Sequence, residues 1–68
     1  MKIEIASVPD REYLVAEIWD DNILIAEVNQ EKLDLTIEFY FNKDKIKLEY
    51  DYELFIETLI RAKELLKQ

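Results

Sequence analysis

Hydrophobic and polar residues alternate with a period of two along most of the first fifty positions, which is typical of strands with one buried face. The clearest run extends over residues 33–41, where Leu, Leu, Ile, Phe and Phe alternate with other side chains. Shorter runs of the same kind occupy residues 2–6, 13–19, 23–28 and 46–50. The sequence therefore predicts five β-strands.

The period changes after residue 50, where a helix is predicted over residues 52–66. Its apolar positions recur at spacings of three and four: Phe55, Leu59, Ala62 and Leu66. This spacing gives a helix one apolar face. Asp51 precedes the run and is expected to cap the helix N-terminus, because a carboxylate can accept hydrogen bonds from the first free backbone N–H groups.

Two of the strands are near copies, since residues 14–18 read LVAEI and residues 24–28 read LIAEV. Asp20, Asp21 and Asn22 separate them and favour a turn in a chain without glycine. An odd loop of three residues would put the two alternating patterns on the same face. In that register Glu17 lies opposite Ile25 and diagonal to Glu27.

The chain predicts a single α+β domain over residues 1–68, with a five-stranded antiparallel meander sheet and the C-terminal helix packed on one face in two layers. One face of each strand is expected to pack under the helix. These inward residues are Ile3, Ile5, Leu14, Ala16, Ile18, Leu24, Ala26, Val28, Leu35, Ile37, Phe39, Ile46 and Leu48.

Composition excludes several function classes. The net charge of −7 disfavours direct binding to nucleic acid or to an anionic membrane surface, and favours a basic partner. The chain has no cysteine, histidine or glycine, which removes disulfides, thiolate metal sites and glycine-rich phosphate loops. It has no long apolar run that would span a membrane and no signal-peptide pattern, so a cytoplasmic protein is expected.

No enzymatic activity, cofactor or metal site is predicted. The acidic stretch at residues 20–22 lacks the glycine and the later glutamate of a calcium-binding loop. Paired carboxylates would need a pocket that separates their pKa values before they could act as acid and base. A flat outer sheet face does not supply one.

The outward positions instead suggest a recognition face. Each predicted strand carries one outward glutamate: Glu4, Glu17, Glu27, Glu38 and Glu49. Aromatic side chains lie among these acids, and aromatic residues are common anchors in protein interfaces, while acids steer a basic partner. The predicted partner-binding residues are Glu17, Glu27, Glu38, Asp20 and Asp21 for charge, with Trp19, Tyr13 and Tyr40 as anchors.

Other interpretations of this face remain open. The same acidic surface suits an immunity protein or antitoxin against a basic toxin. A homodimer that uses the outer face or an edge strand would make the chain a small structural or regulatory module. An inert surface is a further alternative, because aromatic and β-branched residues favour strands in any case.

The stretches at residues 14–19, 25–31 and 35–40 together resemble a family of very small bacterial and mobile-element proteins, some of which are similar to type I-C anti-CRISPR inhibitors. The resemblance covers most of the chain and rests on its strand pattern. It implies a phage or mobile-element protein that acts as a DNA mimic, binds a CRISPR effector and blocks the surface that holds DNA.

Overall fold

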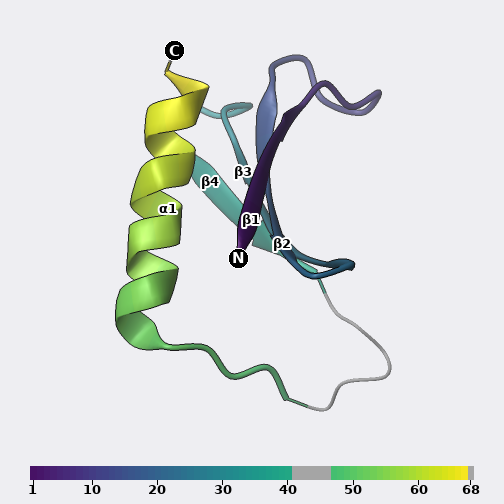
Figure 1. Ribbon diagram of the computed structural model, residues 1–68. Coiled ribbons are helices and arrows are strands. Elements are labelled where there is room, and N and C mark those ends of the chain that lie inside the picture. Colours follow the sequence, from purple (N-terminus) through teal and green to yellow (C-terminus); the bar gives the residue numbers. More distant parts are fainter. Residues whose placement is uncertain (41–46, 68) are drawn as a thin grey trace.

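The computed structural model describes residues 1–40 and 47–67 and has the predicted α+β architecture. Four strands form one antiparallel sheet in the meander order β1-β2-β3-β4, and one helix packs across it (Figure 1). The elements are β1 (Lys2–Ala6), β2 (Val15–Asp20), β3 (Ile23–Asn29), β4 (Thr36–Phe39) and α1 (Tyr52–Leu66).

The predicted fifth strand is not part of the sheet among the described residues. Residues 47–50 form irregular chain that leads into α1, and Ile46 lies outside the described residues. The predicted fourth strand is also shorter than expected, because only Thr36–Phe39 of it is paired, and Phe41 lies outside the described residues. The alternation of hydrophobic and polar residues thus extends beyond the residues that pair with β3.

In the hairpin between β2 and β3, the two alternating patterns share a face as predicted, but the loop that aligns them differs from the predicted one. Its loop has two residues, because Asp20 pairs with Ile23, and Asp21 adopts a positive φ of 53°. A bulge follows, where the partner of Trp19 is Leu24 but the partner of Ile18 is already Ala26. Two loop residues and one bulged residue replace the predicted three-residue loop and shift the register by two positions.

The bulge also explains an error in the predicted core. Ile25 is the extra residue, and consecutive residues in a bulge can point to the same side of the sheet. Ile25 was expected to face outward, yet it is buried in the core cluster. The other members of that cluster are Ala16, Ile18, Ala26, Val28, Ala62 and Leu66.

Helix α1 is fixed at its start by the predicted cap. Asp51 accepts a hydrogen bond from the Leu54 backbone N–H to its Oδ2 atom at 2.9 Å. Tyr50 ties the preceding chain to the β2–β3 hairpin, because its hydroxyl donates to Asp20 Oδ2 at 3.1 Å. The Phe55 ring stacks against Tyr50 and Phe39, with centroids 6.0 and 6.4 Å apart.

One helix does not cover the whole inner face. An α-helix with its side chains is about 10 Å wide, whereas four strands about 4.8 Å apart spread over roughly 14 Å. α1 packs on β1, β2 and β3. Phe39 on β4 is therefore 64% exposed and Ile37 is 40% exposed. Ile5, Leu14, Leu35 and Leu48 were also predicted to be in the core and are exposed.

No helix in the described residues combines the length and the hydrophobicity needed to cross a membrane.

Candidate functional site

Four glutamates form a ladder across the face of the sheet opposite α1. Glu4 is the cross-strand partner of Glu17, Glu17 is the partner of Glu27, and Glu27 is the partner of Glu38. The predicted diagonal placement of Glu17 and Glu27 is wrong, because the bulge brings the two directly opposite each other. We refer to Glu4, Glu17, Glu27 and Glu38 as the glutamate ladder.

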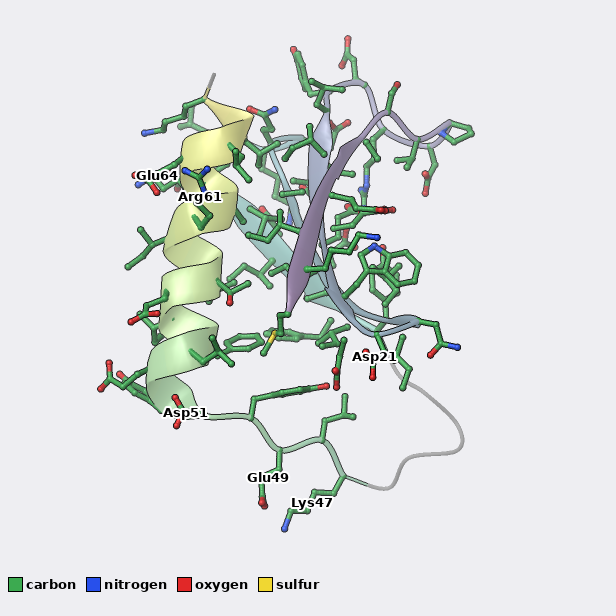
Figure 2. All side chains as sticks on the ribbon, in the orientation of Figure 1. Asp21, Lys47, Glu49, Asp51, Arg61 and Glu64 are labelled. Carbon is green, nitrogen blue, oxygen red and sulfur yellow. The ribbon has the colours of Figure 1, made fainter. Side chains whose placement is uncertain are left out.

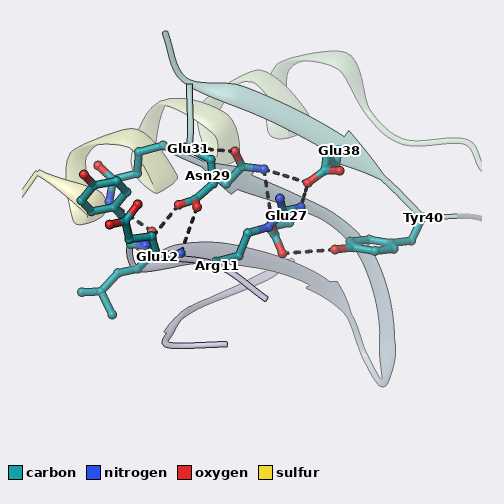
Figure 3. Close-up of polar contacts among 10 residues, drawn as sticks. Arg11, Glu12, Glu27, Asn29, Glu31, Glu38 and Tyr40 are labelled. Carbon is teal, nitrogen blue, oxygen red and sulfur yellow. Dashed lines mark hydrogen bonds and ion pairs between the residues drawn. The ribbon is translucent and has the colours of Figure 1, made fainter. Parts of the chain in front are cut away.

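Direct pairing of like charges on neighbouring strands is destabilising, so the ladder needs compensating partners. Arg11 supplies the main one from the segment between β1 and β2 (Figure 3). Its Nε atom donates to Glu27 Oε2 at 2.9 Å, and its guanidinium forms an ion pair with Glu38 Oε2. Arg11 thereby forms ion pairs with two adjacent glutamates of the ladder.

Neutral donors complete the network around Glu27. Asn29 Nδ2 donates to Glu27 Oε2 at 3.1 Å and to Glu38 Oε2 at 2.8 Å. The Tyr40 hydroxyl donates to Glu27 Oε1 at 3.1 Å. Burial raises the pKa of Tyr40 above its usual 10.0, and the hydrogen bond to Glu27 raises it further. Glu27 is only 4% exposed, and its charge is balanced within the fold.

The other half of the ladder is more open. Glu17 Oε1 accepts a hydrogen bond from Trp19 Nε1 at 3.3 Å, and Glu4 Oε1 pairs with Lys2 Nζ at 2.9 Å. The Glu4 side chain is 44% exposed, and exposed ion pairs of this kind contribute little to stability. Glu4 and Glu17 thus present their carboxylates at the surface with weaker compensation than Glu27.

The segment that carries Arg11 is anchored to the far end of β3. Glu31 accepts hydrogen bonds from the backbone N–H groups of Glu12 at 2.9 Å and Tyr13 at 3.1 Å. Gln30 Nε2 donates to the Leu14 carbonyl at 3.1 Å. In Figure 1 this segment extends from the sheet away from α1. Val15, which directly follows this segment and is absent from the predicted core, is fully buried.

The predicted partner-binding residues divide into three groups. Glu17, Glu27, Glu38, Trp19 and Tyr40 gather around the ladder, and of these Glu27 is buried rather than at the surface. Asp20 and Asp21 lie at the β2–β3 turn, where Asp21 is exposed (Figure 2). Tyr13 is exposed in the segment that Glu31 anchors.

Glu49 does not belong to the outer face. It was predicted as the outward glutamate of the fifth strand, but it lies in the irregular chain before α1 (Figure 2). It is exposed and pairs with Lys47 at 2.9 Å between Nζ and Oε1. The row of acids on the sheet therefore has four members.

Sequence reasoning missed Arg11 and Asn29, which organise the site. Arg11 is the only arginine before residue 61, and it lies between the first and the second of the acidic strands. Asn29 follows Glu27 by two residues and so shares its face of the strand. A single arginine before the helix and an amide in phase with the glutamates were the signals in the sequence.

The ladder is an open surface. An apolar hollow of about 400 Å³ lies beside α1 instead, lined by Tyr50, Tyr52, Phe55, Ile56 and Leu59. Within residues 1–40 and 47–67, no group of three or more acidic side chains is placed to hold a metal ion. A flat acidic surface bordered by aromatic rings is suited to contact with a macromolecule.

Comparisons with models of protein families, with curated proteins and with solved structures find no match to this chain.

Proposed function

We propose that the chain is a non-enzymatic inhibitor whose glutamate ladder occupies a basic, nucleic-acid-binding surface of a partner protein. The direct cross-strand register of Glu4, Glu17, Glu27 and Glu38 is the observation that carries this proposal. The resemblance to anti-CRISPR proteins indicates a type I-C CRISPR effector as the partner. Such an inhibitor would act in the cytoplasm, where it meets the effector.

The spacing of the carboxylates supports a role as a DNA mimic. Neighbouring strands are about 4.8 Å apart, so Glu4 and Glu17 are separated by about one such interval, and Glu38 lies about two intervals from Glu17 because Glu27 between them is buried. A DNA strand carries one phosphate per about 3.4 Å of helix axis. The two charge densities are of the same order, and a Lys- or Arg-lined groove built for phosphates would accept both.

The energetic cost of the ladder also supports binding. Like charges directly opposite on paired strands each reduce stability by up to about 1 kcal/mol relative to neutral pairs. Arg11 and Lys2 offset part of this cost, but four acids face these two cations. A sequence under selection for stability alone would place neutral or opposite charges at these positions.

We assign contact with the partner to the more exposed glutamates of the ladder and to the aromatic side chains beside them. Glu4 and Glu38 each have 44% exposed side chains, and Glu17 is half-buried and accepts a hydrogen bond from Trp19. Tyr40 borders the ladder and is itself exposed. Buried Glu27 has a different role, because it fixes Arg11 and through it the position of Glu38.

The proposal is tested by competition for DNA. Purified type I-C effector complex is incubated with labelled target DNA and increasing amounts of the chain, and bound DNA is measured by electrophoretic mobility. We expect the chain to displace DNA, with an affinity that falls as salt is raised, because the complex is charge-steered. An effector that binds DNA equally well at saturating chain and low salt refutes the proposal.

Two matched double variants locate the binding surface. Glu4→Lys with Glu17→Lys reverses the charge of the two ladder glutamates that make no contact with Arg11, and leaves the Arg11 network intact. Glu57→Lys with Glu64→Lys makes the same change in net charge on the exposed face of α1. We expect the first pair to weaken inhibition at least about tenfold, and the second to retain it. Equal losses from both pairs would mean that overall charge, and not the ladder, governs binding.

A further inference from the structure

Strand β4 has an unpaired edge. The Tyr40 backbone N–H donates to the Ile25 carbonyl at 2.9 Å, which fixes the phase of the hydrogen bonds between β4 and β3. Because these bonds alternate along an antiparallel pair, Thr36 and Glu38 point their backbone groups toward β3. Ile37 and Phe39 point theirs away from it. Among the described residues, no strand pairs with that outer side of β4.

Within residues 1–40 and 47–67, this edge lacks the usual protection against pairing. Exposed edge strands in natural proteins are commonly blocked by charged side chains, prolines or a covering element. β4 carries one charge, Glu38, and that side chain points to the outer face, where Arg11 and Asn29 hold it. On the inner face Ile37 is 40% and Phe39 64% exposed, and Leu35 beside them is also exposed.

We propose that β4 pairs antiparallel with β4 of a second copy of the chain, about a two-fold axis that passes beside Ile37. The two sheets then join into one continuous eight-stranded sheet. Ile37 lies opposite Ile37 of the second copy, and Leu35 lies opposite Phe39 of the second copy. The outward backbone groups of Ile37 and Phe39 find partners, and the exposed apolar side chains of both copies form one strip on the inner face.

The charges on and beside β4 favour this register over its two neighbours of the same parity. A two-fold axis at Thr36 would place Glu38 opposite Asp34 of the second copy, and an axis at Glu38 would place the two Glu38 side chains opposite each other. Both arrangements pair like charges and are destabilising. The axis at Ile37 places Glu38 opposite Thr36 and Asp34 opposite Tyr40, so no like charges meet.

Registers shifted by one residue are excluded by the directions in which the backbone hydrogen-bonding groups of β4 point. If Ile37 lay opposite Glu38 of the second copy, apolar and acidic side chains would share a face. The backbone N–H and C=O groups of Glu38 would have to form the hydrogen bonds to the second copy, but they already point toward β3. The edge of β4 is therefore complementary to itself when the two-fold axis passes beside Ile37.

The opposite edge of the sheet is a weaker site for a second copy. Lys2 and Glu4 of β1 pair with each other within the chain, at 2.9 Å between Nζ and Oε1. Ile3 packs against the core, and α1 covers β1 more fully than it covers β4. Ile5 is the one large apolar side chain of β1 that is exposed, at 39%, whereas Ile37 and Phe39 are both exposed on β4.

A charge-swap experiment tests the proposed dimer. The molar mass in solution is measured by sedimentation equilibrium over a range of concentrations, and wild type is expected to reach about twice the 8.2 kDa of one chain. Ile37→Lys and Ile37→Glu each place two like charges face to face across the axis. Each variant alone is expected to dimerise at least about tenfold more weakly.

Mixing the two variants distinguishes loss of the interface from loss of folding. An equimolar mixture of Ile37→Lys and Ile37→Glu pairs opposite charges, so we expect the mass of a dimer to return. Ile60→Lys, on the exposed face of α1, is the matched control and should leave the dimer unchanged. Wild type that remains at the monomer mass at millimolar concentration overturns the proposal. A wild-type dimer that Ile60→Lys dissociates and Ile37→Lys does not also overturns it.

Discussion

Arg11 and Glu27 are sixteen residues apart in the sequence, yet Arg11 Nε lies 2.9 Å from Glu27 Oε2 in a partly buried ion pair. The same guanidinium reaches Glu38 on the neighbouring strand. The contact joins the segment before β2 to the centre of the sheet and allows two glutamates to stand side by side. It makes Arg11 the residue on which the stability of the glutamate ladder depends most.

Arg11→Ala is therefore expected to lower the free energy of unfolding by about 3 kcal/mol, because it leaves the buried Glu27 carboxylate without its cation. Urea denaturation followed by circular dichroism measures the loss. Arg61→Ala is the control, since Arg61 makes only an exposed pair with Glu64 at 4.0 Å and its loss should cost under about 0.5 kcal/mol. Similar losses in the two variants would contradict a structural role for Arg11.

Asn29→Asp tests the neutral donor in the network. The substitution keeps the shape of the side chain but removes the Nδ2 donor to Glu27 and Glu38 and adds a fifth carboxylate. We expect a loss of about 2 kcal/mol, because buried acceptors lose a hydrogen bond and gain a repulsive neighbour. Asn22→Asp makes the same chemical change in the exposed β2–β3 turn and should be nearly neutral. The idea fails if thermal or urea unfolding does not separate the two variants.

The hydroxyls of Tyr40 and Tyr50 predict a loss of stability in alkali. Burial, followed by the hydrogen bond to Glu27, raises the pKa of Tyr40, and burial, followed by the hydrogen bond to Asp20, raises the pKa of Tyr50. In the unfolded chain each titrates near 10.0. Their contribution is fully present below that pH and is lost as pH rises through the higher folded values.

Tyrosinate absorbance during alkaline titration checks the raised values, and urea denaturation at increasing pH checks the loss of stability. In a variant that carries Tyr40→Phe and Tyr50→Phe, the fall in stability above the ordinary tyrosine pKa should be smaller than in wild type. A double variant with the same pH dependence as wild type would show that these hydroxyls are not linked to folding.

Asp51→Ala removes the N-cap of α1. The Leu54 backbone N–H loses its bond to Asp51 Oδ2, so the free energy of unfolding should fall by about 1 kcal/mol. Asp34→Ala deletes an exposed aspartate outside any strand or helix and should change stability by less than about 0.5 kcal/mol. Helix content at the midpoint of thermal unfolding provides a second measurement. An unchanged unfolding midpoint for Asp51→Ala would contradict the capping role.

Patterns of short range predicted most of the fold. Alternation located β1 to β4, and the spacing of Phe55, Leu59, Ala62 and Leu66 together with Asp51 placed α1 where it is found. These signals depend on residues close in sequence. The shared face of the glutamates followed from the same alternation, and the structure confirms it for Glu4, Glu17, Glu27 and Glu38.

Features that depend on distant residues were not predicted. The burial of Glu27 requires Arg11, Asn29 and Tyr40 to converge from three segments, which no local pattern encodes. The exposure of Phe39 depends on the width of the sheet relative to one helix. Alternation also continues past the end of β4, because a strand pattern records which face a residue prefers and not whether a partner strand is present.

Because of the bulge between Ile18 and Trp19, the register of the β2–β3 hairpin does not depend on the length of its turn alone. Seven residues lie between Ile18 and Ala26, and any division of them between loop and bulge keeps Glu17 opposite Glu27. Natural variation can therefore rewrite the turn at Asp21 and Asn22 freely, provided the total is kept. In distant homologues, an interval of ten positions between two acidic residues is the signature to search for, rather than any particular loop motif.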